Sequence, residues 1–196
     1  MTETNTIART LHDTGLAAWF GGSLMGAVGL NGASGEVTDP SDRTRVANAG
    51  WGRWTPVNLA AIAAHVVGSL QLTRENAGRL KGQKGVATTA AVKTGVTAAA
   101  LAATAYSRVL GQKVMDAEAA ASSGSVSADG LPSQDATTPV GGVSDEVASA
   151  QRQLKALQWA IPVLTGALLV LNARMGEQQR PTQVAAGLVR RLLPIG

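Results

Sequence analysis

The stretch ALQWAIPVLTGALLVLNA, residues 156–173, contains eighteen consecutive residues without a formal charge. A surface helix of a water-soluble protein carries a charged face, whereas a helix that crosses a bilayer needs about 20 mainly apolar residues. Pro162 lies inside the stretch and should kink the helix, which a membrane bundle tolerates when neighbouring helices satisfy the freed carbonyl group. Residues 156–174 are therefore predicted to span a membrane.

Two further uncharged stretches come earlier in the chain. The first contains 22 residues without a formal charge, from 14 to 35, and the second contains 20, from 54 to 73. Both reach the length that a transmembrane helix requires. They predict spans over about 14–31 and 55–73.

A third candidate span is shorter than these. Only 14 uncharged residues, 94–107, follow Lys93, and they are rich in alanine and threonine. The side chain of Lys93 can extend toward the membrane surface, as long basic side chains do near helix ends. We therefore expect residues 86–107 to span the membrane. The alternative is a three-span protein in which this segment is an amphipathic surface helix.

The four stretches together predict an all-α fold, an integral membrane bundle of four transmembrane helices in one domain over residues 1–196. Turn-forming residues between 32 and 54 predict a loop. Residues 114–143 are rich in Ser, Ala, Gly and Pro, which predicts a flexible loop before the fourth span.

The C-terminal third of the chain contains two further helix signals. Ser144 is followed by two acidic residues, which predicts a helix start that continues without interruption into the fourth span. Within residues 182–193, apolar residues recur at helical spacing opposite Arg190 and Arg191. This pattern predicts a short helix that lies in the membrane interface.

The composition excludes several classes of protein. Apolar residues make up 45% and charged residues 15%, and the mean hydropathy of +0.09 averages uncharged stretches with polar connectors. One Tyr, one Phe and a net charge of +4 do not provide the basic, aromatic surface of a nucleic-acid-binding protein. Without cysteine, thiolate catalysis and Cys-ligated metal sites are excluded. No motif of a hydrolase or kinase occurs, so no catalytic residue is assigned.

The distribution of Lys and Arg predicts the orientation. With four spans, ten of these residues lie on the side of the two termini and seven lie on the other side. Because basic residues accumulate on the cytoplasmic side, both termini are expected in the cytoplasm. The predicted location is the bacterial cytoplasmic membrane, with the lipid bilayer as the principal partner.

The first span contains small residues at four-residue spacing, namely Ala18, Gly22 and Gly26. Such a face allows another helix to approach to backbone contact. Packing against a second span of the same chain is the favoured interpretation. An interface with a second copy or with another membrane protein is the alternative.

The two histidines, His12 and His65, raise the question of a haem held by two imidazoles. If the first helix begins near residue 14, His12 lies at its mouth. His65 then lies about seven residues along the second helix from the same side, roughly 10 Å deeper. Because the two axial ligands of one haem have to lie level, the sequence instead favours an interhelical hydrogen bond for His65 and a polar pair with Asp13 for His12. No metal site is assigned.

Four polar side chains lie at predicted membrane depth: Asn58, His65, Lys93 and Asn172. Ionisable residues inside a membrane often mark a path for ions or solutes, which makes His65 and Lys93 the candidate polar site. The competing interpretation is structural, with these groups hydrogen-bonded between helices and Lys93 extended toward the interface.

The segment LHDTGLAAWFGG, residues 11–22, resembles the first helix of small membrane proteins related to the copper-resistance D family. Those proteins have a Leu-His pair near the membrane entry and Trp-x-Gly-Gly one or two turns later. The resemblance implies a polytopic membrane protein and transfers one residue, His12. The segments QWAIP, from 158 to 162, and GEQQRP, from 176 to 181, resemble Ala- and Gly-rich actinobacterial membrane proteins without an assigned activity.

Three functions are compatible with these features. The first is a non-catalytic accessory or scaffold protein that uses the small-residue face of the first helix. The second is a small transporter or ion-conducting protein that uses His65 and Lys93. The third is a redox protein linked to haem or copper.

Overall fold

The computed structural model describes residues 3–75, 77, 86–122, 133–139 and 143–178, and it is all-α apart from one short hairpin. The helices are α1 (Glu3–Met25), a π-helical turn (Gly26–Leu30), α2 (Asn31–Gly35), α3 (Pro40–Glu75), α5 (Val86–Ser122) and α6 (Asp145–Gln178). The strands are β1 (Ser133–Asp135) and β2 (Thr138–Pro139).

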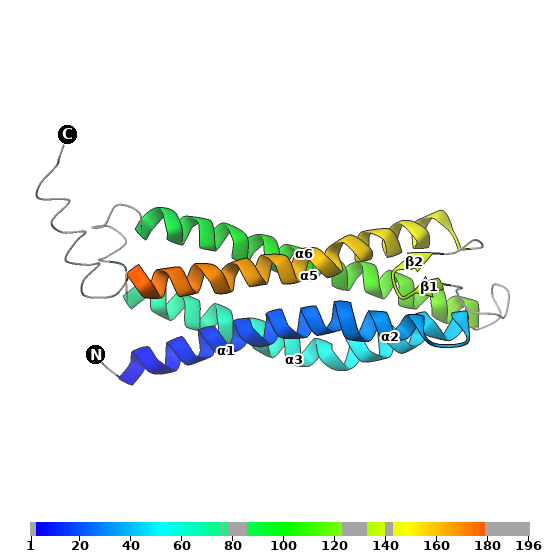
Figure 1. Cartoon of the computed structure of the whole chain (residues 1–196), viewed down its shortest axis with the longest axis horizontal. Coiled ribbons are helices and arrows are strands. Elements are labelled where there is room, and N and C mark those ends of the chain that lie inside the picture. The colour runs from blue at the N-terminus through cyan, green and yellow to red at the C-terminus, as the bar shows by residue number, and fades with distance from the viewer. Residues whose placement is uncertain (1–2, 76, 78–85, 123–132, 140–142, 179–196) are drawn as a thin grey trace, which may run out of the picture.

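The four long helices form an elongated bundle in which each helix runs antiparallel to the one before it (Figure 1). α1 packs along α3, α5 packs along α6, and α1 also packs against α6. The helices therefore follow the order α1, α3, α5, α6 around the bundle. The remaining neighbouring pair, α3 and α5, makes far fewer contacts than the others.

The β1–β2 hairpin packs against α2, α3 and α6 at the end of the bundle opposite the N-terminus (Figure 1). Ser133 pairs with Pro139, and Asp135 pairs with Thr138. The backbone amide of Ala136 donates a hydrogen bond to Ser34 Oγ at 3.3 Å, which attaches the buried turn of the hairpin to α2.

Several helix boundaries differ from those predicted. The expected loop over 32–54 is wrong, because α2 extends to Gly35 and α3 already begins at Pro40. The expected loop over 114–143 is wrong in its first part, since 114–122 belong to α5. Alanine-rich sequence favours helix there, and Val114 is buried in a cluster with residues of α6.

One prediction for the C-terminal third of the chain is confirmed, and others fall outside the described residues. The helix that starts after Ser144 does continue into the fourth apolar stretch, and the amide of Val147 donates to Ser144 Oγ at 3.4 Å. Residues 123–132 and 140–142 of the predicted loop lie outside the described residues, as does the predicted interfacial helix at 182–193.

The interior of the bundle combines small apolar clusters with many polar side chains. One cluster consists of Leu16, Trp19, Ala100 and Leu168, which are fully buried and come from α1, α5 and α6. The buried polar residues include His12, Asn31, His65, Gln151 and Thr165. In contrast, large apolar side chains on every long helix face outward, such as Met25, Leu59, Val109 and Val163.

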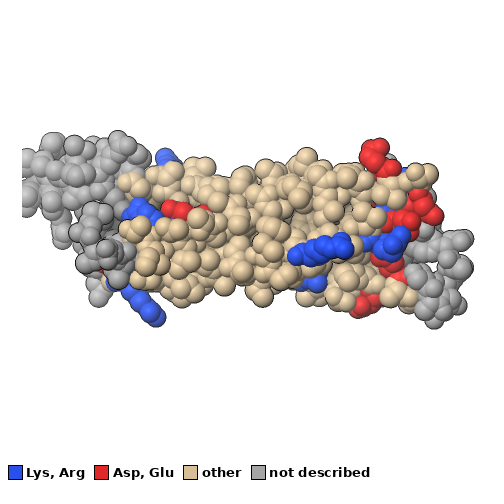
Figure 2. Space-filling view, turned by 90° about the horizontal axis from the view of Figure 1, so that it is seen from below, with Lys and Arg blue, Asp and Glu red and all other residues tan. Residues whose placement is uncertain are grey.

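Two described helices are long and apolar enough to cross a membrane, namely Asp42–Glu75 and Asp145–Gly176. Only 11% and 22% of their most apolar windows are buried in the protein. The central helix of a water-soluble protein would be mostly buried instead. Figure 2 shows a band without Lys, Arg, Asp or Glu on this face, between charged groups near one end and Lys or Arg side chains that reach toward the middle from the other.

Two glycines, Gly15 and Gly68, allow α1 and α3 to approach to backbone contact. A Cβ atom on Gly15 would lie 2.4 Å from the backbone oxygen of Ala61 and 2.6 Å from the nitrogen of His65. A Cβ atom on Gly68 would lie 2.5 Å from the oxygen of Ala8 and 2.6 Å from the nitrogen of His12. Each glycine therefore faces the backbone beside the histidine of the other helix.

We expect Gly68→Ala to destabilise the protein, because the added methyl group would overlap the backbone of α1. A cost of about 1–3 kcal/mol in the free energy of unfolding is typical of such overpacking. Thermal unfolding in detergent, followed by circular dichroism, measures the change.

Gly21→Ala is the matched control, since a Cβ atom at Gly21 meets no other atom within 4 Å. Replacing an exposed helical glycine by alanine usually stabilises a helix by about 0.5–1 kcal/mol. Equal effects of the two substitutions would contradict the importance of the contact at Gly68.

Candidate functional site

Four ionisable side chains form a connected group near the end of the bundle where α1 begins, and we call His12, Asp13, His65 and Lys93 the polar cluster. His12 Nδ1 lies 2.7 Å from Asp13 Oδ1, and His12 Nε2 lies 2.7 Å from Lys93 Nζ. His65 Nδ1 lies 3.0 Å from the backbone oxygen of His12. Three helices, α1, α3 and α5, contribute to the group.

The chemistry of the partners determines the hydrogen positions. A lysine ammonium group has only donors, so Lys93 donates and His12 Nε2 accepts. The proton of neutral His12 is then on Nδ1, which donates to the carboxylate of Asp13. A backbone oxygen only accepts, so His65 donates through Nδ1. His65 Nε2 is buried without a hydrogen-bond partner among the described residues.

The predicted difference in depth between the two histidines is wrong. Their ring centroids lie 4.4 Å apart. The estimate failed because α1 begins at Glu3, so His12 already lies within the helix and not at its mouth. The contacts of Gly15 and Gly68 then bring the two helices together at the level of the rings.

A repeated sequence pattern indicates that His12 and His65 can lie close together. His12-x-x-Gly15 in α1 and His65-x-x-Gly68 in α3 have the same spacing. In two antiparallel helices, the glycine of each motif can face the histidine of the other, as the structure shows. Sequence reasoning concentrated on Gly22 and Gly26 and missed this repeat.

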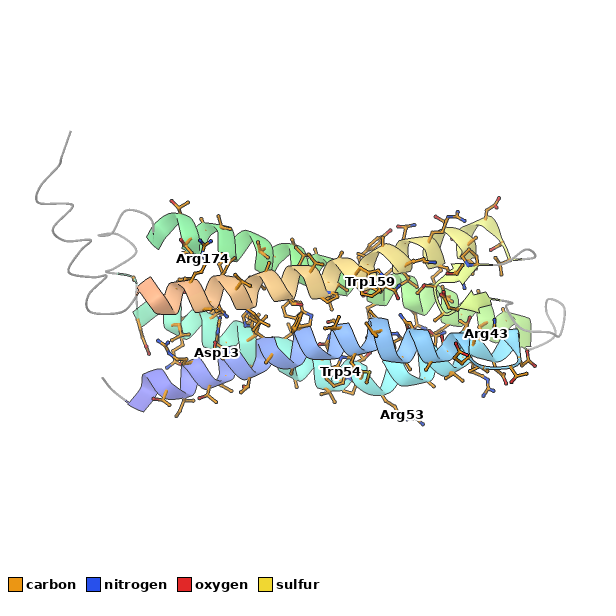
Figure 3. All side chains as sticks on the ribbon, in the orientation of Figure 1. Asp13, Arg43, Arg53, Trp54, Trp159 and Arg174 are labelled. Carbon is orange, nitrogen blue, oxygen red and sulfur yellow. The ribbon has the colours of Figure 1, made fainter. Side chains whose placement is uncertain are left out.

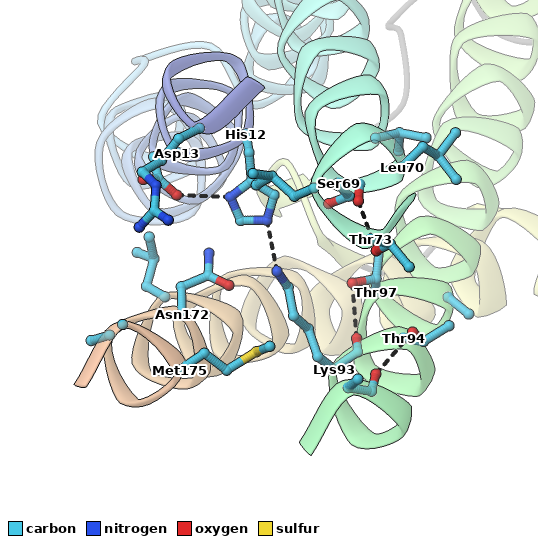
Figure 4. Close-up of a pocket in the computed structure, with 18 of the residues that line it drawn as sticks. His12, Asp13, Ser69, Leu70, Thr73, Lys93, Thr94, Thr97, Asn172 and Met175 are labelled. Atoms are coloured by element: carbon cyan, nitrogen blue, oxygen red, sulfur yellow. Dashed lines mark hydrogen bonds and ion pairs between the residues drawn. The ribbon is translucent and has the colours of Figure 1, made fainter. Parts of the chain in front are cut away.

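Lys93 does not extend toward the helix end as the structural interpretation expected. It reaches from α5 across the bundle, and Figure 4 shows its ammonium group directed toward His12. The lone pair of His12 Nε2 provides an acceptor there. The position of Asp13 beside His12 also provides the negative charge that the sequence did not place near Lys93.

The polar cluster borders a cavity of about 750 Å³ between the four long helices (Figure 4). This volume is within the range of small-molecule sites, about 300–1,000 Å³. Arg9, His12, Asp13, Lys93 and Asn172 contribute ionisable or amide groups to its wall.

The arrangement of the histidines does not fit a haem held between them. Two axial imidazoles bind one iron from opposite faces of the porphyrin, which has to lie between the rings. The rings of His12 and His65 are instead in direct contact, and both nitrogens of His12 have other partners. Among the described residues, no group of three or more His, Cys, Asp or Glu side chains could hold a metal ion.

The small-residue face of α1 is used within the chain. A Cβ atom on Gly22 would lie 1.9 Å from the ring of Trp54, and one on Gly26 would lie 2.1 Å from the ring of Trp51. Ala18 is half-buried. Figure 3 shows Trp54 in the middle of the bundle, whereas Arg53 points away from it. These contacts favour packing inside the chain over an interface with another protein.

A second group of polar contacts lies closer to the hairpin and had no sequence signal. Trp51 Nε1 donates to Asn31 Oδ1 at 2.8 Å, and Asn31 Nδ2 donates to Gln158 Oε1 at 2.8 Å. This chain connects α3, α2 and α6. By contrast, the buried amide groups of Gln151 and Asn172 have no partners among the described residues.

A buried carboxyl group lies near the end of α5, beyond the residues predicted to span. Burial raises the pKa of Glu118, and the hydrogen bond from Asn48 Nδ2 at 3.2 Å offsets this only in part. The exposed carboxylate of Glu146 differs, because its ion pair with Lys113 lowers its pKa.

The comparisons with known proteins yield no relative. The chain matches no protein-family model, no curated protein and no solved structure. The site described above therefore has to be interpreted from its own geometry.

We expect Glu118→Gln to stabilise the protein at pH 8 and to have little effect at pH 4. A raised pKa in the folded state means that ionisation of Glu118 opposes folding, so wild-type stability falls as the pH rises through that pKa. The amide keeps an acceptor for Asn48. A gain of about 1 kcal/mol would raise the melting temperature by about 2–4 °C in a chain of this size.

The matched control is Glu146→Gln, which removes a carboxylate whose pKa is lowered and whose ionisation therefore favours the folded state. We expect it to give no gain at pH 8. A melting temperature for Glu118→Gln that is below the wild-type value at pH 8 would refute the interpretation of Glu118.

Proposed function

We propose that the chain is a four-span bundle of the bacterial cytoplasmic membrane, and that it is a small transporter or ion-conducting protein. In this proposal both termini lie in the cytoplasm, and the polar cluster is the functional site. The observation that carries the functional part is the direct contact of Lys93 with His12 beside the cavity.

Support for four spans comes from which side chains face outward. Met25 on α1, Val109 on α5 and Val163 on α6 are each 65–69% exposed, and Leu59 on α3 is 66% exposed. Polar side chains such as His65 are buried instead. This distribution suits a lipid environment, because lipid solvates apolar side chains while polar groups pair between helices.

Support for α1 and α5 as spans also comes from the polar cluster. Lys93 was the obstacle to a span over 86–107, because an isolated charge inside a bilayer is costly. The contact with His12, and through it with Asp13, gives the ammonium group a hydrogen-bond acceptor and a nearby negative charge. A charge paired in this way is tolerated at membrane depth.

Support for transport or conduction comes from the order of groups in the polar cluster. Lys93, His12 and Asp13 are joined by two hydrogen bonds of 2.7 Å, so a proton can pass from the ammonium group to the carboxylate through the imidazole. The cavity gives a solute access to the same groups. The scaffold alternative has lost its basis in Gly22 and Gly26, because tryptophans of the same chain cover them.

Cysteine labelling tests the proposed membrane topology. Single cysteines can be introduced directly, because the chain contains no cysteine of its own. Thr38→Cys and Asp116→Cys should react with a membrane-impermeant maleimide added to intact cells, and Glu75→Cys should react only after lysis. Labelling is read by mass shift on a gel.

The cysteine at Asp116 distinguishes a four-span protein from a three-span protein. If α5 does not cross the membrane, Asp116 stays on the same side as Glu75, and its cysteine reacts only after lysis. Reaction of the cysteine at Glu75 in intact cells would reverse the proposed orientation.

We predict that Lys93→Ala reduces flux in liposomes. Full-length protein is reconstituted with a pH-sensitive dye inside, and proton movement is followed after a pH gradient and a counter-ion gradient are imposed. We expect at least about a tenfold loss of rate, equivalent to about 1.4 kcal/mol in the barrier.

Lys113→Ala is the control, because Lys113 is on the same helix but pairs with Glu146 at the other end of the bundle. It should retain the wild-type rate. Equal rates for Lys93→Ala and Lys113→Ala, with both variants monodisperse in detergent, would rule out conduction through the polar cluster.

A further inference from the structure

The cavity changes from polar to apolar along the bundle. On α5 it is lined by Lys93 and, two turns further toward the middle, by Leu101. These two positions are about 12 Å apart along the helix. On α6 Asn172 is followed toward the middle by Leu169, although Met175 lies beyond Asn172, and on α3 Thr73 lies beside Leu72 and Leu70. The ionisable and amide groups of the wall are therefore gathered at one end of the cavity, and its other end is apolar.

The polar end has an excess of positive charge. Among its described lining residues are two cations, Arg9 and Lys93, and one carboxylate, Asp13. The carboxylate already accepts a hydrogen bond from His12. The ammonium group of Lys93 has three donors, and its contact with His12 uses one of them. This end is complementary to an anion.

Asn172 adds an independent indication of a ligand. Both polar atoms of its side-chain amide are buried, and neither has a partner among the described residues. The residue lines the cavity, and Figure 4 shows its amide near Lys93 and His12. A buried amide without a partner is unfavourable, and a bound polar group would satisfy it.

The packing of the helices provides a route into the cavity. α3 and α5 both line it, yet they make the fewest contacts of the neighbouring pairs in the bundle. Leu70 of α3, at the cavity wall, is 54% exposed. In a membrane, the junction between α3 and α5 would face acyl chains.

We propose that this cavity binds a single-chain amphiphile with an anionic head, such as a fatty acid, that enters from the bilayer between α3 and α5. The head pairs with Lys93 and with the amide of Asn172, and the chain lies along Leu101 and Leu169. The proposal rests on the membrane location proposed above, and it specifies the solute class of the same site.

Binding is tested on full-length protein in nanodiscs of zwitterionic lipid. The probes are oleate, oleyl alcohol and inorganic phosphate, and bound molecules are counted by native mass spectrometry during titration. We expect one oleate per chain. Oleyl alcohol, which has the same chain without the charge, should bind at least tenfold more weakly, and phosphate should not compete with oleate.

Two pairs of variants locate the site. Lys93→Gln should weaken oleate binding at least tenfold, whereas Lys113→Gln, which removes the same charge from the other end of α5, should leave it unchanged. Leu101→Trp should block the apolar end, whereas Leu59→Trp, at an outward-facing position of α3, should not.

Each contrary result has a distinct meaning. Equal binding of oleate and oleyl alcohol by the wild-type protein would refute recognition of an anionic head. This comparison does not depend on whether the variants fold. Phosphate that displaces oleate shows a site for soluble anions and overturns the amphiphile while leaving the transport proposal intact. Oleate binding that is equal in Lys93→Gln and Lys113→Gln places the ligand elsewhere. Failure of the membrane topology itself is detected separately by the cysteine labelling.

Discussion

Backbone contact between α1 and α3 at Gly15 and Gly68 sets the arrangement of the end of the bundle that holds the polar cluster. Any residue with a Cβ atom at these positions would force the two helices to shift, since that atom would lie within 2.6 Å of the facing backbone. At this contact the rings of His12 and His65 lie 4.4 Å apart, and Nε2 of His12 lies 2.7 Å from Nζ of Lys93 on α5. The glycine pair thereby brings together the two histidines, one of which meets the charge of a third helix.

In the rest of the bundle, polar side chains are buried beside small apolar clusters, and many large apolar side chains face outward. Asn31 connects Trp51 with Gln158, and Trp19 donates to Thr104 at 3.2 Å, so side-chain hydrogen bonds join the helices across the interior. In the membrane location proposed above, such bonds and close packing would provide specificity, because apolar surface gains little by leaving lipid for protein. The looser junction between α3 and α5 is the exception, and it coincides with the cavity.

The sequence predicted the helical class and the approximate centres of the four long helices, because long uncharged, apolar stretches favour long helices. It did not predict helix ends, since a charged residue can remain helical when it stays exposed, as Arg9 does at the cavity wall. The depth of His12 was wrong because the first helix was assumed to begin after the charged residue Asp13. The contact between Lys93 and His12 depends on three-dimensional packing, although the repeated His-x-x-Gly spacing of His12 and His65 was available as a clue. The pairing of Asn48 with Glu118 spans 70 residues and left no local signal.

The π-helical turn at Gly26–Leu30 has a consequence for how the chain tolerates changes in length. Deleting one residue from a regular helix rotates everything beyond it by about 100° and turns buried side chains outward. A π-helical turn already contains one residue more than an α-helical turn. Loss of a single residue such as Val28, which is exposed, can therefore relax the turn to an α-helix and leave Asn31 and Ser34 facing the interior. This turn, between α1 and α2, is a place where a one-residue deletion would preserve the rotational phase of the following helix.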